Sequence, residues 1–150
     1  MSRAILVAGL LLTLAALGGC AFWEPPPPVN DTRIVAASPQ LALDRARRWL
    51  AAHRFEIEKA HRHRSGGQLV ASRSPFETSG YARCAWTFRI SGGVEPAARV
   101  TVIAEAERAG HTRVTAKVEI ALVNGVGDRA ECASHGVLEQ EVLTAIASGA

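Results

Sequence analysis

The chain contains 150 residues, of which 48% are hydrophobic and 21% are charged, so it is long enough to bury one ordinary core. Its formal net charge at pH 7 is only +3, which is too small an excess to indicate a nucleic-acid partner. The sequence contains no serine-hydrolase elbow, phosphate-binding loop, zinc-protease helix or dinucleotide-binding turn. The sequence therefore carries none of these signatures of an enzyme class.

The first twenty residues have the layout of an export leader that ends in a cysteine. Arg3 supplies a short cationic start, and residues 4–17 form an uncharged apolar run. The run is shorter than the ~20 residues of a membrane-spanning helix. It ends in Leu17-Gly18-Gly19-Cys20, which resembles the lipobox of bacterial lipoproteins. An ordinary secretory signal, cleaved without lipidation, is the alternative.

The resemblance implies that residues 1–19 form a signal peptide and that Cys20 becomes a lipidated N-terminus. Members of this class carry a diacylglyceryl group on the cysteine and usually an acyl chain such as palmitate on its amine, which suffices for stable membrane attachment. Ala21 follows the cysteine, where lipoproteins retained in the inner membrane often have aspartate. The resemblance therefore implies an outer-membrane lipoprotein that faces the periplasm.

Lipidation of Cys20 would leave Cys84 and Cys132 as an even pair in an oxidising compartment. We therefore predict a disulfide between Cys84 and Cys132. It would close a loop of about 48 residues and stabilise the fold by about 4 kcal/mol in the chain-entropy model. The competing interpretation is a free Cys132 that acts with His135 in nucleophilic catalysis.

Residues 20–31 are predicted to form a tether between the lipid and a single domain at residues 32–150. Residues 25–28 are four consecutive prolines, which favour polyproline II and a semi-rigid spacer of about 3.1 Å per residue. Phe22 and Trp23 are suited to the headgroup level of a membrane. A proline-rich ligand for an aromatic groove is the alternative interpretation of this segment.

A short strand at residues 33–36 is expected to precede a helix that begins at Ser38-Pro39 and ends near His53. Serine is a favoured N-cap, and proline suits the first helical position. The apolar side chains at helical spacing are Leu43, Ala46 and Leu50. Trp49 flanks this face, so core packing is the favoured role and ligand contact the alternative.

Residues 55–58 and 68–72 are predicted to be strands joined through a turn at Ser65-Gly66-Gly67. His61 and His63 would share one strand face before that turn, as two ligands of a metal would. Because no third ligand follows at a recognisable spacing, we interpret them as part of a solvated basic tip. We predict neither a metal nor a cofactor.

Residues 81–90 alternate between inward and outward side chains and form the most aromatic predicted strand of the chain. Pro96 is expected to lie in the break that follows this strand. Tyr81 begins this strand, and its predicted inward residues are Cys84, Trp86, Phe88 and Ile90.

The clearest predicted hairpin joins residues 99–107 to residues 112–123, with Gly110 in the left-handed conformation. The predicted register places Glu107 opposite His111, Glu105 opposite Arg113 and Arg99 opposite Glu119. Glu105 and Glu107 resemble a glycosidase carboxylate pair, but a solvated charge ladder is the favoured interpretation.

Cys132 is expected in a polar loop, followed by a last helix that Ser134 caps. The whole pattern predicts an α+β fold with two layers. It would contain an antiparallel sheet of four to five strands, with an N-terminal and a C-terminal helix packed on one face.

These features favour a non-enzymatic accessory or interaction module that supports another envelope protein. The alternative is a module that binds a small ligand or an envelope polymer in a groove between sheet and helices. The aromatic residues proposed for that surface are Trp49, Tyr81 and Trp86.

Overall fold

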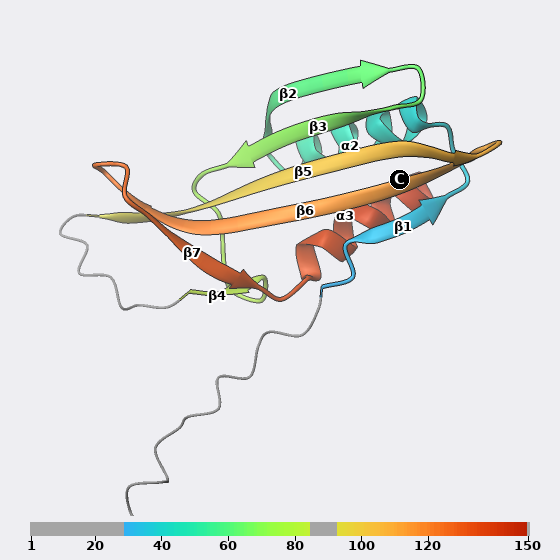
Figure 1. Cartoon of the computed structure of the whole chain (residues 1–150). Coiled ribbons are helices and arrows are strands. Elements are labelled where there is room, and N and C mark those ends of the chain that lie inside the picture. Colours follow the sequence, from blue (N-terminus) through green and yellow to red (C-terminus); the bar gives the residue numbers. More distant parts are fainter. Residues whose placement is uncertain (1–28, 85–92, 150) are drawn as a thin grey trace, which may run out of the picture.

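The computed structural model describes residues 29–84 and 93–149. In these ranges the chain forms an antiparallel sheet and two helices (Figure 1), so the predicted α+β class is confirmed. Cys20, Trp86 and most of the predicted tether lie outside the described residues.

Seven strands form the sheet in the order β2-β3-β5-β6-β7-β4, with β1 paired to β6. The strands are β1 (Thr32–Val35), β2 (Glu56–His63), β3 (Gly66–Arg73), β4 (Ala82–Arg83), β5 (Val94–Arg108), β6 (His111–Asn124) and β7 (Arg129–Ser134). The prediction of four to five strands was therefore wrong. Strand β7 lies in the segment that was expected to be a polar loop. Its own residues are too few to show a strand pattern, and it is the pairing with β6 that makes this segment a strand.

Strand β6 is the strand around which the other strands are arranged. One edge of β6 pairs with β5, while its other edge is shared by two shorter strands. Strand β1 pairs with residues 112–115 of β6, and β7 pairs with residues 120–123. The end of β7 in turn pairs with β4, which brings Tyr81 and Cys84 to this corner of the sheet.

Helix α2 (Pro39–Ala52) has the predicted bounds. The side chain of Ser38 accepts a hydrogen bond from the backbone N–H of Leu41, and His53 is the C-cap. Helix α3 (Val137–Ser148) begins later than predicted, because Ser134 ends β7 and Gly136 is the N-cap. Ser134 still contacts the first turn of α3, since its hydroxyl donates to Glu139 at 2.9 Å.

Both helices and the central strands contribute to one hydrophobic cluster. Its large members with almost no exposed surface include Leu43, Leu50, Leu69, Val100, Val102, Val114, Ile120, Val142, Leu143 and Ile146. In Figure 1 the helices lie behind the central strands of the sheet. Gly67 allows α2 to approach β3 closely, because a β-carbon at Gly67 would lie 2.7 Å from Cδ1 of Leu43.

The long hairpin confirms most of the predicted register. Glu105 lies opposite Arg113, and Arg99 lies opposite Glu119. The pairing of Glu107 with His111 was wrong, because an irregularity between residues 106 and 108 places Arg108 opposite His111.

Pro96 lies inside β5, where the sequence predicted a break. The missing N–H is tolerated because β3 ends its pairing at Ala98, so the edge at Pro96 has no ladder partner. The carbonyl oxygen of Pro96 instead accepts a hydrogen bond from the backbone N–H of Phe76 at 2.8 Å.

Candidate functional site

The predicted disulfide between Cys84 and Cys132 is present, with an S–S distance of 2.04 Å. It joins the segment after β4 to β7. Because both sulfur atoms are bonded to each other, Cys132 has no thiol to act with His135 as a nucleophilic pair. The structure therefore argues against the catalytic interpretation of these two residues and assigns the cysteines a structural role.

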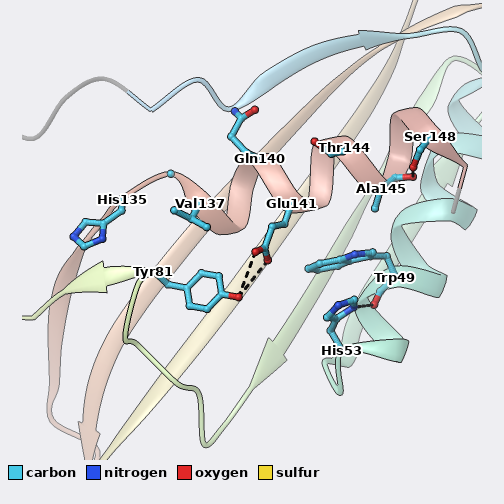
Figure 2. Close-up of a pocket in the computed structure, with 11 residues that line it drawn as sticks. Trp49, His53, Tyr81, His135, Val137, Gln140, Glu141, Thr144, Ala145 and Ser148 are labelled. Carbon is cyan, nitrogen blue, oxygen red and sulfur yellow. Dashed lines mark hydrogen bonds between the residues drawn. The ribbon is translucent and has the colours of Figure 1, made fainter.

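A hollow of about 770 Å³ lies beside the disulfide corner, along the exposed side of α3. We call it the α3 groove. Its walls come from α3, from the C-terminal end of α2 and from Tyr81 (Figure 2). The lining residues are Trp49, His53, Tyr81, His135, Gly136, Val137, Gln140, Glu141, Thr144, Ala145 and Ser148.

Trp49 and His53 form the α2 wall of the groove. They are four residues apart and therefore lie on the same face of the helix end. Their rings are stacked, with centroids 3.8 Å apart and an interplanar angle of 22°. Nδ1 of His53 lies 2.8 Å from the carbonyl oxygen of Trp49, so this nitrogen donates. The hydrogen bond and the stacking fix the orientation of the half-buried indole.

Tyr81 reaches the groove from the segment between β3 and β4. Its backbone carbonyl accepts a hydrogen bond from the N–H of His135 at 2.8 Å, which ties this segment to the start of α3. Its ring packs against Phe76 with centroids 5.4 Å apart. The hydroxyl donates to the Glu141 carboxylate, with both oxygens at 3.4 Å (Figure 2).

Burial and the neighbouring Glu141 carboxylate both act on the Tyr81 hydroxyl. Burial is the larger cause, and together they raise the pKa of Tyr81 above its usual value of 10.0. Tyr81 is therefore protonated at neutral pH and remains a hydrogen-bond donor to Glu141.

Polar side chains of α3 connect the groove to β1. The Arg33 guanidinium donates to Oε1 of Gln140 and to Oγ1 of Thr144, both at 3.3 Å. The Gln140 amide also donates to the carbonyl oxygen of Asn30. These contacts hold one wall of the groove in place through residues that precede α2 in the chain.

The groove thus combines aromatic and aliphatic surfaces with a single carboxylate. Trp49 and Tyr81 offer ring faces, while Val137 is 40% exposed and Ala145 lies on the same helix. Glu141 provides a hydrogen-bond acceptor between the two rings (Figure 2). Such a surface is suited to binding an elongated ligand by ring contact and a few hydrogen bonds.

The structure places two of the three predicted aromatic residues, Trp49 and Tyr81, in this groove. Sequence reasoning did not assign Glu141, Gln140 or His53 to it. The available signal was helical spacing, since residues 137, 141, 145 and 148 recur on one side of α3. That spacing alone does not indicate whether the same side is covered by another element.

The other candidate residues lie away from the groove. His61 and His63 lie on exposed β2 with ring centroids 6.2 Å apart. In the described ranges, no three His, Cys, Asp or Glu side chains are grouped so that they could hold a metal ion. Arg113 bonds Glu107 at 2.9 Å and lies opposite Glu105 on an exposed part of the hairpin.

Comparisons with protein-family models, curated proteins and solved structures gave no match to this chain. Among residues 29–84 and 93–149, neither helix has the length and apolar character needed to cross a membrane.

Proposed function

We propose that this chain is an outer-membrane-anchored periplasmic lipoprotein and that its domain is a non-enzymatic interaction module of the cell envelope. The lipobox-like segment at residues 17–20 supports the anchor. The disulfide between Cys84 and Cys132 fits an oxidising compartment. In this proposal the two helices form one layer against the sheet, and the module contacts its partner through the opposite, outward side of that layer.

One observation carries the proposal: the α3 groove places Trp49 and Tyr81 on either side of Glu141. Tryptophan and tyrosine contribute strongly to protein interfaces because each buries a large area at a small cost in side-chain entropy. The groove follows a helix of twelve residues, which has a length of about 18 Å. An extended segment of an envelope protein is the partner that best fits this shape.

Chemical cross-linking in intact cells tests the proposal with a matched pair of variants. Trp49→Ala removes the indole from the groove. Leu41→Ala removes an apolar side chain from the same helix that is 41% exposed and does not line the groove. We expect the envelope protein that cross-links to the parent chain to be lost with Trp49→Ala and kept with Leu41→Ala. Equal recovery from both variants would exclude the groove as the contact site.

The alternative function is binding of a small ligand or an envelope polymer in the same groove. Its volume of about 770 Å³ falls within the ~300–1,000 Å³ usual for ligand sites. Soluble fragments of the cell-wall glycan should then raise the melting temperature of the parent protein and leave that of Trp49→Ala unchanged. This result without a cross-linked protein would favour the alternative.

The membrane anchor is tested separately. Cys20→Ser removes the sulfur that the lipobox resemblance assigns to lipidation. We expect the parent protein to fractionate with outer membranes and the variant to lose this association. Mass spectrometry of the parent N-terminus should show acyl chains on Cys20; an unmodified cysteine would contradict the proposed anchor.

A further inference from the structure

Two arginines contact residues that line the α3 groove. The guanidinium of Arg33, on β1, donates to the side chains of Gln140 and Thr144, both at 3.3 Å. The guanidinium of Arg73, the last residue of β3, donates to the carbonyl oxygen of His53 at 3.2 Å. Gln140 and Thr144 belong to the α3 wall and His53 to the α2 wall (Figure 2). A positive charge therefore lies behind each of these two walls.

A third arginine lies at the C-terminal end of α3. The guanidinium of Arg45 donates to the carbonyl oxygen of Ile146 at 2.9 Å. The same group lies 3.2 Å from the position that a β-carbon on Gly149 would occupy. Arg45 precedes Trp49 by about one turn of α2, so both side chains lie on one side of that helix. This guanidinium is thus placed near the end of the groove that Ser148 lines.

The hydrogen-bond acceptors of these three arginines are uncharged. Four other arginines each form an ion pair with a carboxylate, namely Arg62, Arg99, Arg113 and Arg129. Within residues 29–84 and 93–149, the ion pairs do not include Arg33, Arg45 or Arg73. A neutral oxygen accepts a hydrogen bond without cancelling the charge, and a guanidinium has more N–H donors than these bonds use. The three groups therefore keep both charge and donors for an anionic partner.

The groove itself has the opposite charge at its centre. Among the described residues that line it, Glu141 is the acidic one, and it lies between Trp49 and Tyr81 (Figure 2). Its carboxylate accepts a hydrogen bond from the Tyr81 hydroxyl and can accept several more. Backbone N–H groups of an extended segment would supply these donors, whereas an acidic side chain at the same place would be repelled.

The shape of the site favours a peptide over an anionic membrane surface. The groove is a hollow of about 770 Å³, and the headgroups of a flat bilayer would cover its rim without filling it. They would also bring phosphate groups toward the carboxylate of Glu141. A narrow chain with an apolar centre and charged ends meets neither obstacle.

We propose that the α3 groove binds an extended partner segment that has an apolar or aromatic centre and acidic side chains at both ends. This inference rests on the proposed function and names the chemistry of its partner. The centre packs on Trp49 and Tyr81 while its backbone donates to Glu141. The acidic ends form charge-assisted hydrogen bonds with Arg45 and with Arg33 or Arg73.

Fluorescence anisotropy of labelled probe peptides measures this preference for charge. The full lipidated chain is held in nanodiscs of phosphatidylcholine. Every probe has leucine and tyrosine at its centre, and its two residues at each end are all glutamate, all serine or all lysine. We expect the glutamate probe to bind about tenfold more tightly than the serine probe at low ionic strength, because several exposed charge pairs each add a modest gain. This difference should fall to about twofold in ~0.5 M salt.

Substitutions of the arginines identify where the charge is recognised. Arg45→Gln and Arg73→Gln should each weaken binding of the glutamate probe about threefold, while the serine probe binds as before and shows that the groove is intact. Arg113→Gln is the control, because this arginine pairs with Glu107 away from the groove. Equal weakening of both probes would make Arg45 and Arg73 structural and overturn the proposal.

Three further outcomes would also overturn it: equal affinities of the glutamate and serine probes, tighter binding of the lysine probe, or no binding of any probe. Glycerophosphoglycerol, the soluble headgroup of phosphatidylglycerol, tests the lipid source by calorimetry. Binding of this headgroup without a preference for glutamate over serine would make anionic lipid the occupant.

These readouts separate the acidic segment from the proposed partner site. Loss of the cross-linked protein in Trp49→Ala, together with equal binding of the glutamate and serine probes, would reject the acidic segment and retain the partner site. A preference for glutamate, together with equal cross-linking of Trp49→Ala and Leu41→Ala, would retain the charge selectivity and reject the groove as the protein contact.

Discussion

The two flanks of the sheet are held together in different ways. On one flank, β2 pairs with β3 from Glu56 to His63, and ion pairs join Arg62 to Asp44 and Arg99 to Glu58. On the other flank, β4 contributes only two residue pairs to β7, and the disulfide between Cys84 and Cys132 lies beside them. Extended backbone pairing, with one irregularity between Ile57 and Lys59, thus organises the first flank, while a covalent bond and side-chain contacts organise the second.

The difference bears on where the groove lies. A long pair of strands leaves little irregular surface, whereas the short β4 and the segment before it bring Tyr81 across to α3. Residues outside regular strand pairing can be positioned for binding by a few contacts with distant parts of the chain. The groove therefore lies beside the flank that contains the disulfide.

The largest expected effect comes from removing that covalent bond. Cys84→Ser combined with Cys132→Ser should lower the free energy of unfolding by about 4 kcal/mol, because the unfolded chain loses its closed loop. Urea unfolding of both proteins under non-reducing conditions measures the difference. Reduction of the parent protein should have a similar effect. An unchanged unfolding midpoint in the double variant would show that this corner does not depend on the disulfide.

A backbone clash should destabilise the opposite flank. Gly67→Ala would place a β-carbon 2.5 Å from the carbonyl oxygen of His61 and 2.7 Å from Leu43. We expect a loss of about 2 kcal/mol in urea unfolding, because backbone atoms must shift. Gly125→Ala is the control, since a β-carbon there meets nothing within 4 Å. Equal stability of the two variants would mean that α2 and β3 can separate without cost.

A smaller effect should appear in alkaline solution at the groove. Because the pKa of Tyr81 is raised by burial and by Glu141, its stabilising contribution is complete below the unfolded value of about 10 and is lost as the pH rises through the folded value. Tyr81→Phe removes this loss, so its unfolding free energy should fall less steeply than that of the parent above about pH 10. Parallel pH profiles would contradict the assigned environment.

The smallest effect should appear in acid at the other flank. The pKa of Glu58 is lowered, first by the hydrogen bond from Ser72 and then by Arg99. The stabilisation from its carboxylate is therefore present above the usual glutamate pKa of 4.5 and is lost as the pH falls through the lower pKa of the folded state. Glu58→Gln should flatten the acid side of the stability profile while leaving the alkaline side unchanged. A steeper acid loss in the variant would reverse the assignment.

Several features could be predicted because the residues that determine them are close in sequence. Ser38 and Pro39 define the start of α2 through their own capping chemistry. The opposite charges of Glu105 and Arg113 gave the right register within one hairpin. The local irregularity at residue 107 was not predicted, because no side-chain pattern distinguishes a bulge from a longer turn there.

The amino-acid sequence by itself determined the α+β class, the bounds of α2 and the main hairpin. Capping and alternation are local properties that act before the domain is assembled, whereas the pairing of Cys84 with Cys132 among three cysteines was predicted only from the expected lipidation of Cys20. Only the tertiary structure decided that β7 completes the sheet and that Trp49, Tyr81 and Glu141 surround one groove. These residues are far apart in the chain, and their approach depends on the hydrophobic cluster that α2, α3 and the central strands share and on the disulfide between Cys84 and Cys132.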